Sequence, residues 1–151
     1  MGILSQRTAI RDLVFSELST ISTSDPSGQW QTSPELHKFW VEHDQATRYP
    51  ALCVVLTDEA YKLDRMQGIT VDCKMKIIGY VSNPKDSRAE LDKLIEDVIY
   101  KLSSSGAIRQ AVTNLAIDSL HADEGTSVAQ PFAQFVMVWT FEFQRRFGFA
   151  G

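Results

Sequence analysis

The stretch FAQFVMVWTFEFQ, which runs from Phe132 to Gln144, decides how this chain folds. Successive side chains of a β-strand point to opposite faces of a sheet, so alternation at every second residue indicates a strand. One face would carry Phe135, Met137, Trp139, Phe141 and Phe143. The other would carry Gln134, Val136, Val138, Thr140, Glu142 and Gln144. We expect a long strand here, with its aromatic face packed against helices.

Shorter patterns predict three further strands. Residues 51–56 form an apolar run rich in β-branched side chains, which is typical of a strand buried on both faces. Residues 69–77 alternate strictly between apolar and polar side chains, which predicts a half-buried strand. Residues 114–121 alternate more weakly and are assigned as the third strand along the chain.

The segment between the first two strands is a candidate contact surface. It covers residues 57–68 and is too long for a tight turn. We therefore expect a hairpin with a protruding loop that carries Tyr61 and Arg65.

Two amphipathic helices are expected. The first has Ser5 as its N-cap and ends before the turn-forming residues 22–28. Its apolar face is formed by Ile10, Leu13, Val14, Leu18 and Ile21. The second begins at the capping box Ser87 to Glu90 and ends at the run Ser103 to Gly106. Its apolar stripe is formed by Leu91, Leu94, Ile95, Val98, Ile99 and Leu102.

This order of elements predicts an α+β fold, with a mostly antiparallel four-stranded sheet and two amphipathic helices packed on one face. The length of 151 residues is that of one domain, so residues 1–151 are expected to form a single unit. A long loop is expected at about 22–49, and a flexible C-terminal tail at about 146–151.

Charge and composition exclude several classes of function. The formal net charge is -4 and the basic residues are scattered, which argues against sequence-specific DNA binding. No apolar run is long enough to span a membrane, and no secretory leader is visible, so synthesis in the cytoplasm is expected. Cys53 and Cys73 lie in apolar strands and are interpreted as small buried hydrophobes. The alternative is a disulfide between neighbouring strands, which would be unusual in a reducing cytosol.

A catalytic, cofactor or metal site is not expected. His37 and His43 could bind a metal with Asp44, but their spacing of six residues aligns poorly on any regular element. Asp123 and Glu124 follow His121 before a glycine turn, where acidic residues are usually solvated. Phosphate loops, dinucleotide fingerprints and serine elbows are absent from the sequence.

Several aromatic residues lie outside the expected elements. Trp30 and Trp40 belong to the long loop, where they could either pack under that loop or contact a partner. Phe147 and Phe149 lie among glycines in the last residues of the chain, a pattern that favours docking on a neighbouring molecule.

The arrangement of these features resembles a known family. After the first helix and the long loop, Tyr49-Pro50-Ala51 leads into an apolar strand, and the alternating strand ends in Ile78-Gly79-Tyr80. The helix from Leu91 to Leu102 and a last strand from Phe135 to Phe143, after a loop with Gly125, complete the pattern. The chain resembles the tail terminator and minor tail proteins of siphophages and myophages, over nearly its whole length.

The resemblance implies a structural protein of the virion and not an enzyme. Several copies, typically six, would form a ring at the head-proximal end of the tail. That ring would stop polymerisation of the tube protein and of any sheath protein, and would offer a surface to the head-side connector. DNA would pass through its lumen without specific binding, and neither a cofactor nor a membrane would be involved.

Under this resemblance the functional site is an interface. We expect its anchors to be Trp30, Trp40, Tyr61, Arg65, Phe147 and Phe149, because aromatic residues and arginine are the usual anchors of interfaces. A neck or head-completion connector protein is the alternative in the same class. A small α+β ligand-binding domain or enzyme is the alternative in a different class.

Overall fold

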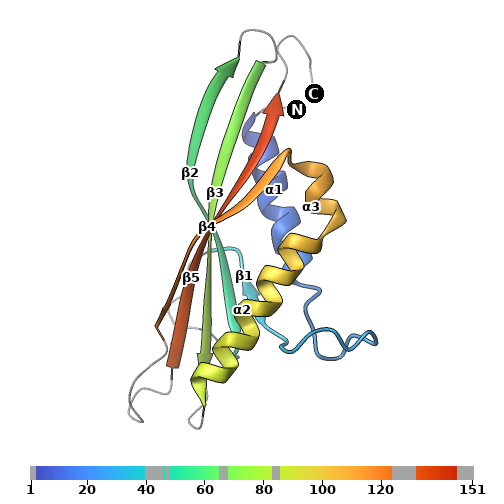
Figure 1. Cartoon of the computed structure of the whole chain (residues 1–151), viewed down its shortest axis with the longest axis vertical. Coiled ribbons are helices and arrows are strands. Elements are labelled where there is room, and N and C mark those ends of the chain that lie inside the picture. Colours follow the sequence, from blue (N-terminus) through green and yellow to red (C-terminus); the bar gives the residue numbers. More distant parts are fainter. Residues whose placement is uncertain are drawn as a thin grey trace.

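A computed structural model describes residues 3–39, 46, 48–64, 68–82, 86–123 and 132–145. Its five-stranded sheet has the order β1-β2-β3-β5-β4, and the only parallel pair in the described residues is β1 with β2. The strands are β1 (Glu35–His37), β2 (Ala51–Asp64), β3 (Gly68–Ser82), β4 (Asn114–Asp123) and β5 (Phe132–Arg145). The long strands twist across one another, and all the described helices lie on one side of them (Figure 1).

The helices are α1 (Ile3–Leu18), α2 (Ser87–Ser104) and α3 (Gly106–Ala111). The predicted α+β class and the mostly antiparallel pairing are confirmed, but the structure describes five strands and three helices where four strands and two helices were predicted. The additional strand β1 lies inside the predicted loop 22–49, and α3 follows the serine run that was expected only to end a helix. Both elements are too short to produce a readable hydrophobic period.

The predicted protruding loop at residues 57–68 is also wrong. β2 continues through Thr57 to Asp64 and pairs with β3 up to Gly68, so the hairpin is two long strands. The register shifts between Leu56 and Glu59, which is a β-bulge or similar irregularity. An exposed strand can carry the polar side chains that suggested a loop.

The main core lies between the helices and one face of the sheet. The predicted aromatic face of β5 is buried there in full, together with Val71, Cys73, Met75 and Ile77 of β3. The helices contribute a set of apolar side chains to the same core: Ile10, Val14, Leu18, Leu91, Leu94, Val98, Leu102 and Ile108. The prediction that the aromatic face of β5 packs against helices is therefore confirmed.

A smaller cluster lies on the opposite face of the sheet. It contains Ala51, Cys53, Ile78 and Tyr80, with Tyr49 partly buried against it. Cys53 thus belongs to the smaller cluster and Cys73 to the main core, and both are buried and form no disulfide with each other. Their interpretation as buried hydrophobes is confirmed.

The ends of the helices differ from the prediction by a few residues. Asp86 and not Ser87 is the N-cap of α2, and its Oδ1 accepts a hydrogen bond from Ala89 N at 3.0 Å. The structure describes α1 from Ile3, so Ser5 lies inside the helix and is not its N-cap. α1 ends at Leu18, although Ile21 is still buried in the core.

Candidate functional site

The predicted interface residues have different environments. Trp30 is 6% exposed and belongs to the main core, as expected if it packs under the loop, so little of its surface is left to contact a partner. Tyr61 is 53% exposed, but it lies on β2 and not in a loop. Trp40, Arg65, Phe147 and Phe149 lie outside the described residues. The expected tail at about 146–151 lies outside them as well.

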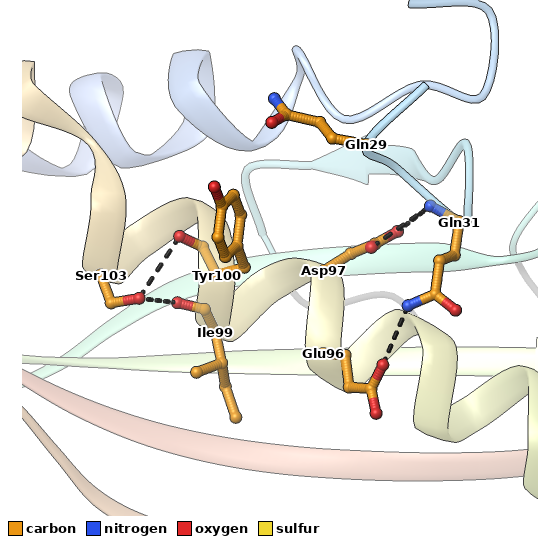
Figure 2. A pocket seen from close by; sticks show the side chains of 7 residues that line it. All are labelled: Gln29, Gln31, Glu96, Asp97, Ile99, Tyr100 and Ser103. Atoms are coloured by element: carbon orange, nitrogen blue, oxygen red, sulfur yellow. Dashed lines mark hydrogen bonds between the residues drawn. The ribbon is translucent and has the colours of Figure 1, made fainter. Parts of the chain in front are cut away.

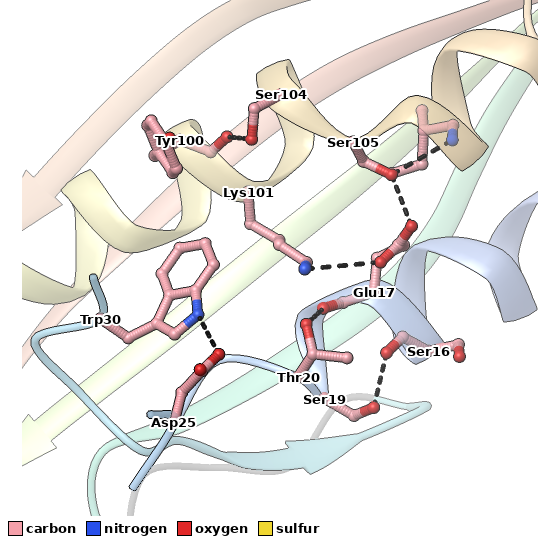
Figure 3. A network of polar contacts seen from close by, with 11 residues as sticks. Ser16, Glu17, Ser19, Thr20, Asp25, Trp30, Tyr100, Lys101, Ser104 and Ser105 are labelled. Carbon is pink, nitrogen blue, oxygen red and sulfur yellow. Dashed lines mark hydrogen bonds and ion pairs between the residues drawn. The ribbon is translucent and has the colours of Figure 1, made fainter. Parts of the chain in front are cut away.

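Trp30 is held from three sides. Its Nε1 donates a hydrogen bond to Asp25 Oδ2 at 3.2 Å, and its ring meets Tyr100 edge to face with centroids 5.6 Å apart. Lys101 Nζ lies 5.3 Å from the centroid of the indole ring, in a cation–π geometry. The indole is therefore a structural anchor for the segment after α1 (Figure 3).

The same region joins the helices to one another. Glu17 of α1 accepts a hydrogen bond from Ser105 Oγ at 2.5 Å and forms an ion pair with Lys101 at 3.6 Å. The three side chains converge between α1 and the junction of α2 with α3 (Figure 3). Charge-assisted hydrogen bonds of this kind are stronger than those between neutral groups, so they fix how the helices pack.

Asp97 holds the segment after Trp30 against α2. This buried carboxylate accepts hydrogen bonds from Gln31 N at 3.0 Å, Thr32 N at 2.9 Å and Thr32 Oγ1 at 2.6 Å. Beside it, Gln31 Nε2 donates to Glu96 Oε2 at 2.9 Å (Figure 2). The sequence analysis missed this clamp. The only indication of it in the sequence is that the acidic residue Asp97 directly precedes Val98, which belongs to the apolar stripe of α2.

A depression of about 570 Å³ lies beside this clamp. Its lining combines Tyr100 with Gln29, Gln31, Glu96, Asp97, Ile99 and Ser103. The carboxylates of Glu96 and Asp97 already accept hydrogen bonds from the protein itself (Figure 2). These carboxylates of the depression therefore hold Gln31 and Thr32 against α2.

The candidate catalytic and metal-binding residues do not assemble in the part of the chain that the structure describes. His37 Nε2 lies 3.1 Å from Glu35 Oε2, whereas His43 and Asp44 lie outside the described residues. His121 and Asp123 are exposed at the end of β4, and Glu124 again lies outside the described residues. Among the described residues, no group of three or more His, Cys, Asp or Glu side chains could hold a metal ion.

Strand β4 forms one edge of the sheet and is exposed over nearly its whole length. Only Leu115 is partly buried among its ten residues. Its one strand neighbour in the described residues is β5, so among these residues no strand pairs with its other edge. Such an edge is a template for pairing with another chain.

The exposed apolar side chains of β4 lie on the helix side of the sheet. Ile117 is opposite Trp139 and Leu120 is opposite Met137, and both partners belong to the main core. Yet Ile117 is 42% exposed and Leu120 is 44% exposed. A groove of about 560 Å³ between α2 and this strand is lined by apolar residues (Ile99, Val112, Leu115, Ile117 and Trp139) and by polar ones (Ser103, Arg109, Thr113 and Asn114). β4 therefore has an apolar face that the helices do not cover.

The opposite edge of the sheet has a similar exposed segment. β1 covers only residues 51–53 of β2, and among the described strands residues 54–64 pair with β3 alone. Leu63 is 70% exposed, and Tyr61 lies two residues before it on the same side. The hydroxyl of Tyr61 donates a hydrogen bond to the carboxylate of Glu59.

The polar face of β4 is tied to the rest of the sheet through Asp118. Its Oδ2 accepts a hydrogen bond from Thr140 Oγ1 at 2.7 Å and pairs with Lys74 Nζ at 3.1 Å. The Thr140 hydroxyl, followed by Lys74, lowers the pKa of this carboxyl from its usual 3.8 despite opposing desolvation. The Asp118 carboxylate is thus ionised at neutral pH and holds the edge strand in place.

No protein-family model matches the chain, and no curated protein matches it in sequence. None of the described helices has the length and apolar character needed to cross a membrane.

Proposed function

We propose that this chain is a structural protein of the tail-terminator type, which closes into a homo-oligomeric ring on the end of a phage tail tube. The ring stops addition of further tube and sheath subunits and provides the surface that joins the head-side connector. The sequence resemblance supports this proposal through the order of its helices and strands.

The observation that carries the proposal is the pair of exposed edges on opposite sides of one sheet. Ile117 and Leu120 on β4, and Tyr61 and Leu63 on β2, are large apolar side chains left in contact with water. Contiguous exposed apolar surface is characteristic of association sites. Two different sites on opposite sides of a protomer suit a head-to-tail contact, which generates a ring when the rotation between copies closes.

A closed ring explains how addition of subunits would end. In a ring every copy uses both of its lateral sites, so no lateral site remains for another copy. Growth can then continue only along the axis, where the two faces of the ring would meet the tube and the connector. Because the two axial faces differ, one partner can be bound while the other is refused.

The proposal is tested by electron microscopy of particles from a phage whose copy of this gene is disrupted. Overlong tails without heads are expected, because nothing would stop tube growth. Tails of regular length that lack heads would instead assign the chain to the neck. Particles with regular tails joined to filled heads would refute both assignments.

A further inference from the structure

The groove between α2 and β4 has the dimensions and lining of a site for an extended peptide. Its apolar lining includes Ile99 of α2, Leu115 and Ile117 of β4, and Trp139 of β5. Its volume of about 560 Å³ is well above the ~150 Å³ of a cavity that holds one benzene ring. Among the described residues no strand lies on the outer side of β4. An extended segment could therefore pair with β4 and place every second side chain in the groove.

The sequence directly after β5 fits such a groove. β5 ends at Arg145, and residues 146–151 (RFGFAG) lie outside the described residues. Phe147 and Phe149 are two positions apart, so both would point to the same face of an extended segment. The segment therefore offers two aromatic anchors at the spacing that the groove requires.

The groove is out of reach of these phenylalanines in their own copy. Arg145 pairs with Ile69, whereas Ile117 pairs with Trp139, six positions earlier on β5. Six residues of strand span about 20 Å, but Phe149 follows Arg145 by four residues, so its Cα can lie at most about 14 Å away. The segment would also have to cross β4. Phenylalanines that fill the groove beside Ile117 therefore come from a second copy of the chain.

We propose that residues 146–149 of one copy add as an antiparallel strand to the outer edge of β4 in the next copy, with Phe147 and Phe149 in its groove. This inference rests on the proposed ring and names one of its contacts. Each copy gives one segment and receives another, so the contact is head-to-tail and can repeat around a ring. Main-chain hydrogen bonds to β4 would supply affinity, and the two aromatic side chains would supply specificity.

The donor segment begins on the side of the protomer away from its own groove. Arg145 is opposite Ile69, and Ile69 is in turn opposite Leu63 of β2. β5 therefore ends beside the hairpin of β2 and β3, where Tyr61 and Leu63 are exposed (Figure 1). A neighbouring copy placed along that edge would present its β4 to the segment that follows Arg145.

Charge favours the antiparallel direction. With Phe147 beside Ile117, an antiparallel segment places Arg146 next to Asp118. Both contacts that hold the Asp118 carboxylate use its Oδ2, so its other oxygen can accept a hydrogen bond from a second cation. A parallel segment would instead direct Arg146 toward the end of the groove that Arg109 lines, where like charges repel.

A labelled peptide tests the site without any change to the fold. The probe is QRRFGFAG, the sequence of residues 144–151, and fluorescence anisotropy measures its binding to the Phe147→Ala/Phe149→Ala variant. Saturable binding is expected. Alanine at both phenylalanines of the peptide should weaken binding by about tenfold or more, as the loss of aromatic anchors usually does. Ile117→Lys in the protein should do the same, because lysine on an edge strand opposes pairing. Ala9→Lys, at an exposed position of α1, is the charge-matched control.

Native mass spectrometry then relates the contact to assembly of the 17.0 kDa chain. The wild type should form rings, and so should Ala9→Lys and Phe39→Ala, the second of which removes a phenylalanine that is 67% exposed elsewhere. Phe147→Ala/Phe149→Ala and Ile117→Lys should each be monomeric alone. An equimolar mixture of these two variants should form a two-chain species and nothing larger, because one intact segment meets one intact groove.

The outcomes separate this contact from the proposed function. Unchanged affinity of the alanine peptide, or of the Ile117→Lys protein, would overturn the docking site. Rings that persist in either variant would overturn the contact and leave the ring in place. Assembly of the wild type into open filaments that both variants abolish would support the contact but refute the terminator ring. A monomeric wild type would refute both.

Discussion

Strands β5 and β4 are hydrogen-bonded neighbours, yet their apolar faces have opposite environments. Both direct their large apolar side chains toward the helices. On β5 these side chains are fully covered, whereas Ile117 and Leu120 of β4 remain more than two-fifths exposed. β5 has a strand on each side and helices above it, while β4 has one strand neighbour among the described residues. The position of a strand in the sheet thus decides whether its apolar face is buried. The alternation of apolar and polar residues in the sequence cannot show this on its own.

The largest effect is expected from truncating the covered strand. Phe141→Ala removes a fully buried ring from the main core and should lower the free energy of unfolding by about 3–5 kcal/mol. The matched change on the edge strand, Leu120→Thr, should alter it by less than about 0.5 kcal/mol, because the side chain is already exposed. Urea denaturation of monomeric protein measures both. Equal losses would contradict the contrast between the strands.

On the face of the sheet that the helices cover, Gly79 has no room for a side chain. A Cβ added to Gly79 would lie 2.1 Å from Cε1 of Phe135, which pairs with it across β3 and β5. Gly79→Ala should therefore destabilise the protein by about 1–3 kcal/mol, the usual cost of overpacking. Adding Phe135→Leu should recover part of that loss, since a smaller side chain leaves room for the methyl group. A double-mutant cycle in urea checks this, and strictly additive losses would show that the two residues do not clash.

Loss of the clamp on α2 should have an effect no larger than that of Gly79→Ala. Asp97→Ala leaves the N–H groups of Gln31 and Thr32 without their acceptor and should cost about 1–3 kcal/mol. Faster hydrogen exchange is expected at these two amides, and unchanged exchange there would refute the clamp. Glu96→Ala is a suitable control, because it removes only an exposed contact to the side chain of Gln31.

The smallest effect should be the pH dependence of the edge strand. A carboxyl with a lowered pKa in the folded state stabilises the fold at pH values above its unfolded pKa. For Asp118 this contribution should be complete well above pH 3.8 and should disappear as the pH falls through the lower folded value. Thr140→Val removes the hydrogen bond that contributes most to lowering the pKa of Asp118. As the pH falls, the melting temperature of this variant should therefore decrease less than that of the wild type. Parallel pH profiles of the two proteins would contradict this assignment.

The sequence predicts best the elements whose side chains repeat regularly. The face of β5 and the apolar stripe of α2 were predicted correctly, because each repeats its pattern over several turns or pairs. The three residues of β1 cannot display a period, and residues 57–64 of β2, which include four charged side chains, suggested a loop. A strand that is exposed on both faces lacks the alternation on which such predictions depend.

The candidate site was harder to predict than the fold. The loop residue Trp30 was weighed as an interface anchor, but contacts with Asp25 and Tyr100 bury it. Thr32 and Asp97 are 65 residues apart, and no local pattern relates them. Tyr61 was expected to be exposed because it was assigned to a protruding loop, and it is exposed, but it lies on strand β2. Leu63, Ile117 and Leu120 were not proposed, because whether an apolar residue is covered depends on the sheet order.

The single residue between α2 and α3 links the stability of three helices. Ser105 is the C-cap of α2 and the N-cap of α3, where its Oγ accepts a hydrogen bond from Ile108 N, and the same hydroxyl donates to Glu17 of α1. A helix of six residues is too short to persist alone, so α3 depends on this joint and on the burial of Ile108. When α1 separates from the sheet, α3 should unravel with it, and the two helices form one cooperative unit of local unfolding although most of the chain separates them.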